Sequence, residues 1–366
     1  MSSSTQAPRL DGSASGLPSE PLAGAGGVLS VGGPTGAGDL PAEEALAERR
    51  RPATGIVDRR LLFVTGKGGV GKTAVAAGLA LLAASRGKRV LVCEMDAKGD
   101  LALAFEAPAC GFDPTEVAPG LFAMTMGPEA SLRQYLSLQL RLPRAAVLGP
   151  VARMFDFVAA AAPGVREIVS VGKLTWEVRE RHYDIVIADA LASGHVTGLL
   201  SAPQTINKLV QVGLVRQQTS WMLDILSDPA TTGAIIVATP EEMPVTETIE
   251  LAGRLEKETT VALLGVVVNR VLPELFGTRE EKVFEALSAP AAREALSKSL
   301  GGEPDGLLDA ARWMVRARRS RASHLQRLRD ALPDVPLFYV PYLFLRSYGM
   351  RATRQVAAAL GQELES

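Results

Sequence analysis

The hydrophobic positions of this chain form short apolar runs separated by longer helix-forming stretches. "RLLFVTG" (60–66) and "RVLVCEMD" (89–96) are such runs, and the stretch between them is rich in Ala and Leu and ends at Gly87. A strand, a helix and a second strand in this order predict parallel strands with a right-handed crossover. Further apolar runs lie at 183–189, 233–239, 262–270 and 336–341. Because strands buried on both faces are apolar throughout, the pattern predicts an α/β fold with a mainly parallel sheet covered by helices on both faces.

Three segments depart from this alternation. Residues 1–54 are rich in Gly, Ser, Ala and Pro without a helical or strand period, so we expect a disordered tail ahead of a domain spanning 55–366. Residues 125–180 show helical periodicity but no strand-like run, which predicts an inserted helical subdomain. Residues 278–331 predict a second helical excursion that ends in an arginine-rich stretch, for which local ion pairs on a solvated face are the simplest interpretation.

Composition narrows the range of partners. The 366 residues carry a net charge of −1, so no global electrostatic attraction to nucleic acid is expected. No uncharged apolar run is long enough for an integral membrane segment, and the N-terminus lacks the apolar centre of a secretory signal. The two cysteines do not form C-x-x-C. We therefore expect a cytoplasmic protein, with contact at a membrane surface left open.

The glycine-rich turn after the first apolar run fits two nucleotide-binding motifs. Gly66, Gly68 and Gly71 match the dinucleotide pattern G-x-G-x-x-G, and the same turn matches the phosphate loop G-x-x-x-x-G-K-T. Lys72 and Thr73 favour the phosphate loop, because its lysine reaches the β- and γ-phosphates of ATP and its hydroxyl ligates Mg²⁺. This chemistry also needs a carboxylate at a later strand end, and Asp189 follows the apolar "DIVIA". The sequence thus predicts a P-loop NTPase that uses ATP and Mg²⁺, with Thr73 and Asp189 at the metal.

The extra lysine of this loop carries a resemblance to a known group. "GKGGVGKT" resembles the deviant phosphate loop of dimeric ATPases such as ParA, MinD, the nitrogenase iron protein and ArsA. In that group the early lysine crosses the dimer interface to the partner's nucleotide, which the resemblance implies for Lys67. Lys67 and Lys72 are then the catalytic lysines. The predicted phosphate-binding residues are Gly66, Gly68, Gly69, Val70, Gly71, Lys72 and Thr73.

Two later segments resemble the switches of the ArsA-type ATPases, the arsenite-pump and tail-anchored-protein-targeting branch. "CEMDAKGDLALAF" (93–105, the first switch) is similar to that branch's D-P-A-H-N-L motif and lacks its Pro and His-Asn. "ADALASGHVTGLLSAP" (188–203, the second switch) is similar to its D-x-A-P-T-G-H motif and lacks the Ala-Pro pair. The resemblance implies that Asp96 orients the attacking water, although an Asp before a helix is also a common N-cap.

The same resemblance assigns further nucleotide contacts. The backbone N–H of Gly194 would reach the γ-phosphate. Asn269 matches an adenine-contacting Asn of the branch and Arg270 would stack on the base, whereas a strand-end cap is the alternative for this pair.

The functional prediction is an Mg-ATP-dependent ATPase of the ArsA type that couples switch movements to a protein or membrane-protein client. One nucleotide domain in the chain requires a homodimer, or a heterodimer with a paralogous ATPase. A client groove is predicted in the 125–180 helices, from Leu132, Tyr135, Leu136, Leu140, Val147, Met154 and Phe155. Two alternatives stay open: a ParA/MinD-like positioning ATPase, and a weakly hydrolysing nucleotide-binding scaffold paired with an active paralogue.

Overall fold

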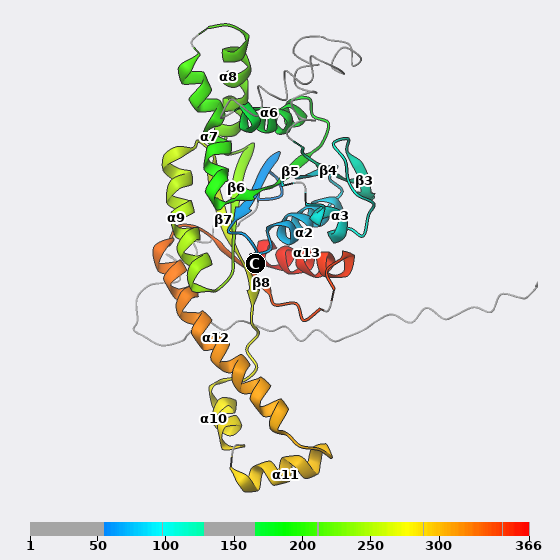
Figure 1. The fold of residues 1–366 in the computed structure, drawn as a ribbon, viewed down its shortest axis with the longest axis vertical. Coiled ribbons are helices and arrows are strands. Elements are labelled where there is room, and N and C mark those ends of the chain that lie inside the picture. The colour runs from blue at the N-terminus through cyan, green and yellow to red at the C-terminus, as the bar shows by residue number, and fades with distance from the viewer. Residues whose placement is uncertain are drawn as a thin grey trace, which may run out of the picture. The chain divides into compact units, whose positions relative to one another are not determined.

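The apolar runs form one eight-stranded sheet in a computed structural model of the protein (Figure 1). The strand order is β3-β4-β2-β5-β1-β6-β7-β8, and every neighbouring pair is parallel except β3 with β4. The strands are β1 (Leu61–Gly66), β2 (Val90–Glu94), β3 (Thr115–Ala118), β4 (Leu121–Thr125), β5 (Ile185–Ala192), β6 (Thr232–Ala238), β7 (Ala262–Val271) and β8 (Leu337–Pro341). The predicted fold class and the six apolar runs taken as strands are confirmed.

The structure describes residues 55–96, 98–127, 165–210, 212–287, 289–345 and 347–365. The tail predicted over 1–54 lies outside these ranges. So do residues 128–164, which include every side chain of the predicted client groove.

Alternate residues of each central strand enter two separate hydrophobic clusters. In β1, Leu62 and Val64 join the cluster on one face, whereas Leu61 and Phe63 join the cluster on the other. All four side chains are fully buried. Burial on both faces explains why the strand sequence is continuously apolar instead of alternating.

Helices cover both faces of the sheet (Figure 1). On one face lie α2 (Lys72–Ser85), α3 (Asp100–Ala104) and α13 (Met350–Glu365). On the other lie α6 (Val165–Arg179), α7 (Ser193–Leu209), α8 (Leu214–Ser227) and α9 (Glu242–Glu258). Helix α6 belongs to the segment predicted as an inserted subdomain, yet it packs directly on β5 and β1.

Two strands at the sheet edge escaped the sequence analysis. Strands β3 and β4 form an antiparallel hairpin whose turn includes Gly120. Strand β3 reads "TEVA" and is half-exposed, so it lacks the apolar run that marked the other strands. A single-sided edge strand of four residues gives little periodicity to detect.

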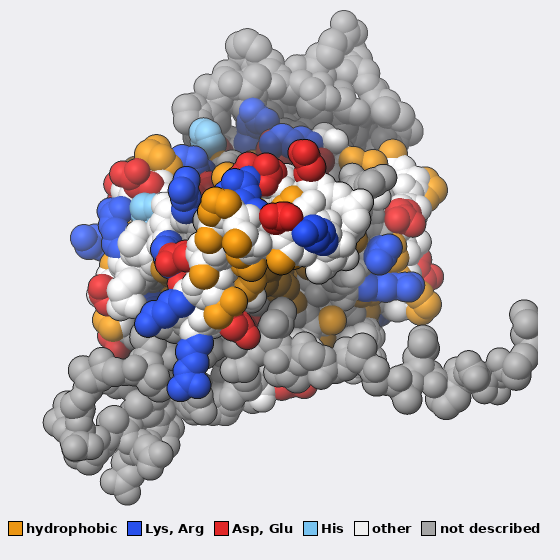
Figure 2. Space-filling view, turned by 90° about the horizontal axis from the view of Figure 1, so that it is seen from below, with side chains coloured by type: hydrophobic (Ala, Val, Ile, Leu, Met, Phe, Trp, Pro, Cys, Tyr) orange, Lys and Arg blue, Asp and Glu red, His pale blue; other side chains and the backbone are white. Residues whose placement is uncertain are grey.

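In the segment 278–331 the structure has α10 (Thr278–Ala286), α11 (Pro290–Leu300) and the long α12 (Asp305–Ala331). Most arginines of α12 contact nearby groups of the same chain: Arg318 meets Glu274, Arg319 meets Glu281 and Arg321 meets Glu241. Figure 2 shows the molecule from below, where basic, acidic and hydrophobic side chains are intermixed among the coloured residues. The arginine-rich stretch is therefore neutralised locally, as expected. Among the described residues, no helix combines the length and apolar character needed to cross a bilayer.

Candidate functional site

The predicted nucleotide residues gather at the carboxyl ends of the central strands. Strand β1 lies between β5 and β6, and the chain leaves β1 for β2 on one side before returning to β6 on the other. Such a reversal opens a crevice beyond the strand ends. A cavity of ≈ 330 Å³ lies here, lined by the phosphate loop, the first switch, the end of β5, and Arg270 and Tyr348.

The loop from Gly66 to Gly71 has the backbone of a phosphate cradle. Gly66 has φ 145° and Gly71 has φ 94°, both in the region that favours glycine. A Cβ on Gly71 would lie 2.4 Å from Nδ2 of Asn269, so a side chain there would displace that amide. Helix α2 starts immediately after Gly71, with no side-chain cap and no acid in its first turn. Its free N–H groups and positive dipole end therefore face the cavity, where an anion is stabilised.

Asn269 supports this loop from beneath. Its Nδ2 donates to the Val70 carbonyl at 2.9 Å, and its Oδ1 accepts from the Arg270 N–H at 2.9 Å. The amide thus acts at the strand end, and Asn269 is not among the residues lining the cavity, while Arg270 is. The adenine contact of Asn269 stays a prediction. Tyr348, which the sequence analysis did not single out, lines the cavity with Arg270.

Lys72, Thr73 and Asp189 meet at the floor of the cavity. The Thr73 hydroxyl donates to Oδ2 of Asp189 at 2.6 Å, across 116 residues of sequence. The Lys72 Nζ donates to the Lys67 carbonyl at 3.3 Å. Burial lowers the pKa of the Lys72 ammonium, and the Asp189 carboxylate opposes that shift.

Asp189 is itself a buried acid with an unused acceptor. Its side chain is 5% exposed, and its Oδ1 atom has no hydrogen-bond partner among the described residues. Desolvation raises its pKa from 3.8 to about 7, against the opposing effects of Thr73 and Lys72. An orphaned carboxylate oxygen beside a threonine hydroxyl and a phosphate loop fits the donor set of Mg²⁺.

This burial predicts a pH effect on stability. A raised pKa means that the folded state holds the proton more tightly than the unfolded chain, so stability falls as pH rises from about 4 to about 7. We expect Asp189→Asn to be about 2–4 kcal/mol more stable than wild type at pH 8, and to lose that advantage towards pH 4. Urea denaturation of nucleotide-free protein in EDTA measures this. A difference between the two proteins that is the same at pH 4.5 and pH 8 would contradict it.

The first switch is held by a buried glutamate. Glu94 is 2% exposed and accepts hydrogen bonds from the backbone N–H groups of Gly99 (3.1 Å) and Asp100 (2.8 Å). Its Oε2 also accepts from the Thr125 hydroxyl of β4 at 3.2 Å. The start of α3 is thus tied to two strands. Asp96 lies in the turn between Glu94 and the two N–H groups that Glu94 binds. Its side chain is exposed and forms an ion pair with Lys98.

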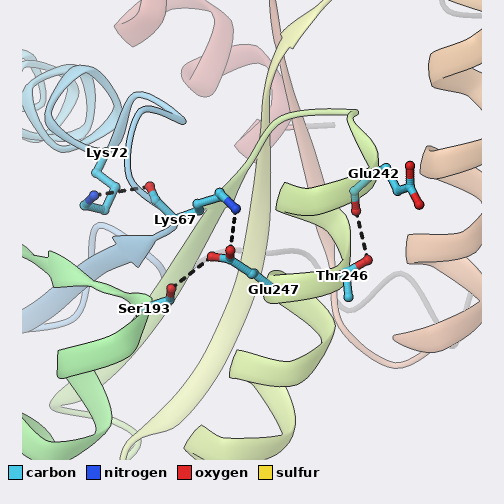
Figure 3. A network of polar contacts seen from close by, with 6 residues as sticks. All are labelled: Lys67, Lys72, Ser193, Glu242, Thr246 and Glu247. Atoms are coloured by element: carbon cyan, nitrogen blue, oxygen red, sulfur yellow. Dashed lines mark hydrogen bonds and ion pairs between the residues drawn. The ribbon is translucent and has the colours of Figure 1, made fainter.

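Lys67 is engaged within its own chain (Figure 3). Its Nζ pairs with Oε1 of Glu247 on α9, and both side chains are 29% exposed. The other oxygen of Glu247 accepts from the Ser193 hydroxyl at 3.2 Å, at the first residue of α7. One carboxylate therefore joins the phosphate loop to the second switch. Gly194 is exposed in the first turn of α7, which places its N–H at a free helix start.

Comparison with known proteins supports this arrangement. The family model described as anion-transporting ATPase matches residues 59–222 and 215–289. ATPase BagA of Mycobacterium tuberculosis is 28% identical over 228 residues, covering 58% of this chain and 66% of that protein. A putative arsenical pump-driving ATPase of Halobacterium salinarum is 29% identical over 259 residues, covering 64% of this chain and 38% of its own length. ATPase GET3 of Podospora anserina is 32% identical over 161 residues, covering 43% and 47%. The matched regions thus span 38–66% of these relatives.

Proposed function

Because the chain belongs to the anion-transporting ATPase family, we propose that it hydrolyses ATP with Mg²⁺ at the interface of two subunits and that its switch movements act on a protein or membrane-protein client. The observation that carries this proposal is the meeting of Lys72, Thr73 and Asp189 below a glycine cradle. A site for a neutral ligand has no use for a free helix start, a half-buried lysine and an orphaned buried carboxylate in one cavity.

Each residue has a defined task in this reaction. The N–H groups around Gly71 and the Lys72 ammonium hold the phosphates. The Thr73 hydroxyl and, through water, Asp189 would hold the metal, which when bound neutralises charge on the phosphate oxygens. Asp96 orients the attacking water and accepts its proton. Arg270 and Tyr348 line the cavity, and the base would stack against them.

The proposed dimer rests on Lys67. In the single chain its ammonium is directed to Glu247, so it contributes nothing to its own phosphate site in this conformation. A lysine at this place in the loop acts on the nucleotide of a second subunit, in the manner of a finger supplied in trans. Glu247 also contacts Ser193, so movement of Lys67 would be felt at the second switch. A homodimer is the simplest assembly, and a heterodimer with a paralogue uses the same geometry.

The proposal that the protein binds a client rests on the resemblance to the tail-anchored-protein-targeting branch. The segment 125–180 is the proposed binding region. The alternative of a positioning ATPase needs a basic surface or a membrane helix. Most arginines of α12 instead contact groups of their own chain. These contacts count against the positioning alternative.

Removal of the phosphate-loop lysine tests the enzymatic proposal. We expect Lys72→Ala to lower ATP turnover at least about 100-fold, because the ammonium neutralises charge on the transferring phosphoryl group. Phosphate release with Mg-ATP measures the rate, alongside Asp96→Asn, which should also be slow. Lys298→Ala, an exposed lysine paired with Glu294 on α11, is the control and should match wild type. Equal background rates in wild type and Lys72→Ala would instead identify a nucleotide-binding scaffold.

A further inference from the structure

A third lysine faces the phosphate site, in addition to Lys67 and Lys72. Lys98 lines the cavity together with Lys72, Thr73 and Asp189. It lies in the first switch, between β2 and α3, and its side chain is 63% exposed. Its partner in the structure is Asp96, the residue expected to activate water, which is 54% exposed.

The backbone around Lys98 is fixed even though its side chain is exposed. Glu94 holds the N–H groups of Gly99 and Asp100, directly after Lys98, and Gly99 has φ 81°. A buried carboxylate with three donors anchors this turn to β2 and β4. Lys98 thus places a long cationic side chain at the cavity from a backbone segment that is held in position.

Lys98 and Lys72 line the same cavity, together with Thr73 and Asp189. The hydrogen bond and the charge of Asp96 raise the pKa of Lys98, and the charges of Asp100 and Asp189 add to that rise. Two cations that converge on one cavity, beside a free helix start, make a site for an anion with more than one charged group.

We propose that Lys98 binds the terminal phosphate of ATP from within the same chain, exchanging its ion pair with Asp96 for the phosphate oxygens. This rests on the proposed ATP hydrolysis. Ion pairs between exposed side chains contribute little, so the exchange is favourable once a triphosphate is present. ADP does not extend to the terminal position, so the exchange distinguishes the two nucleotides.

The exchange places both members of the ion pair in the reaction. Lys98 neutralises charge on the terminal phosphoryl oxygens. Asp96, released from Lys98, accepts a proton from water as the water oxygen bonds to the terminal phosphorus. The bond from that phosphorus to the bridging oxygen breaks, and its electron pair leaves with ADP. Asp96 then returns its proton to solvent, and Lys98 can pair with Asp96 again after phosphate leaves.

Nucleotide affinity of Lys98 variants tests this assignment independently of turnover. We expect Lys98→Gln to bind ATPγS about tenfold more weakly than wild type, as loss of one charge-assisted contact implies, and to bind ADP within about twofold of wild type. Lys98→Arg keeps the cation and should restore most of the affinity for ATPγS. Lys298→Gln is the matched control, since Lys298 is also an exposed lysine paired with an acid, and should leave both affinities unchanged. Calorimetry with Mg²⁺ present gives both dissociation constants.

The expected kinetic counterpart is a lower kcat in Lys98→Gln. If Lys98→Gln keeps the wild-type ratio of affinities for ATPγS and ADP, whether or not both affinities fall, the proposal is overturned. A rise in turnover would also overturn it, because it would mean that Lys98 only masks Asp96. If the wild-type protein binds ATPγS but does not hydrolyse ATP, the enzymatic proposal fails, while the preference between nucleotides still decides the role of Lys98.

Discussion

Two inactive variants, Lys67→Ala and Lys72→Ala, should together recover about a quarter of wild-type ATP turnover when mixed in equal amounts and allowed to exchange subunits. Each variant alone should lose at least about 100-fold. In a mixed dimer, the site of the Lys67→Ala subunit keeps its own Lys72 and receives Lys67 from the partner. The other site lacks Lys72 and stays inactive. Half of the dimers are mixed and half of their sites work, which gives the expected fraction.

Phosphate release as a function of the mixing ratio measures this recovery. The same mixture of Lys72→Ala with Lys72→Ala,Lys67→Ala is the control and should stay inactive, because no subunit in it carries Lys72. If Lys67 acts on the nucleotide of its own chain, no ratio of the two single variants restores activity. Absence of recovery would therefore contradict the homodimer in which Lys67 acts in trans.

Gly66→Ala should destabilise the fold by about 3 kcal/mol or more and remove nucleotide binding. A Cβ on Gly66 would lie 2.2 Å from the Val237 carbonyl oxygen, at a φ of 145°. That oxygen belongs to β6, and Val237 is the residue of β6 that pairs with Gly66 of β1. Neither backbone can therefore move without breaking the pairing of the two strands. The urea midpoint measures the loss of stability, and calorimetry with Mg-ATP measures the loss of binding.

Gly68 offers a matched control in the same loop. A Cβ there meets nothing within 4 Å and its φ is not positive, so Gly68→Ala should change stability by less than about 1 kcal/mol. Equal urea midpoints for Gly66→Ala and wild type would show that β6 does not restrict the loop. Equal losses for both alanine variants would show that the loop tolerates no side chain for a reason other than this contact.

The fold was predictable where burial on both faces leaves a continuous apolar run. Strands β1, β5 and β6 have that character, whereas the half-exposed β3 does not. The floor of the site was predictable for a related reason, since the loop after β1 and the end of β5 must meet at one edge of a parallel sheet. Thr73 and Asp189 do so.

The partners of the site residues were not predictable, because they depend on long-range packing. Lys67 meets Glu247 across 180 residues, and no local pattern marks that glutamate. Glu94 is the last residue of the buried strand β2, where an acid suggests a ligand contact, yet its carboxylate accepts hydrogen bonds from backbone N–H groups of the first switch. Lys98 occupies a position where the related switch motif has no lysine, so the resemblance pointed away from it.

The shared carboxylate of Glu247 has a thermodynamic consequence. In the proposed dimer, Lys67 would leave Glu247 before it reached another subunit, and Ser193 would then remain on a carboxylate that has lost its cation. Subunit association and the position of the second switch would therefore be coupled equilibria, because both depend on the Glu247 carboxylate. Such coupling is reciprocal: if nucleotide at the second switch strengthens association by some factor, association strengthens nucleotide binding by the same factor. The concentration of the protein would thus help to set its apparent affinity for ATP.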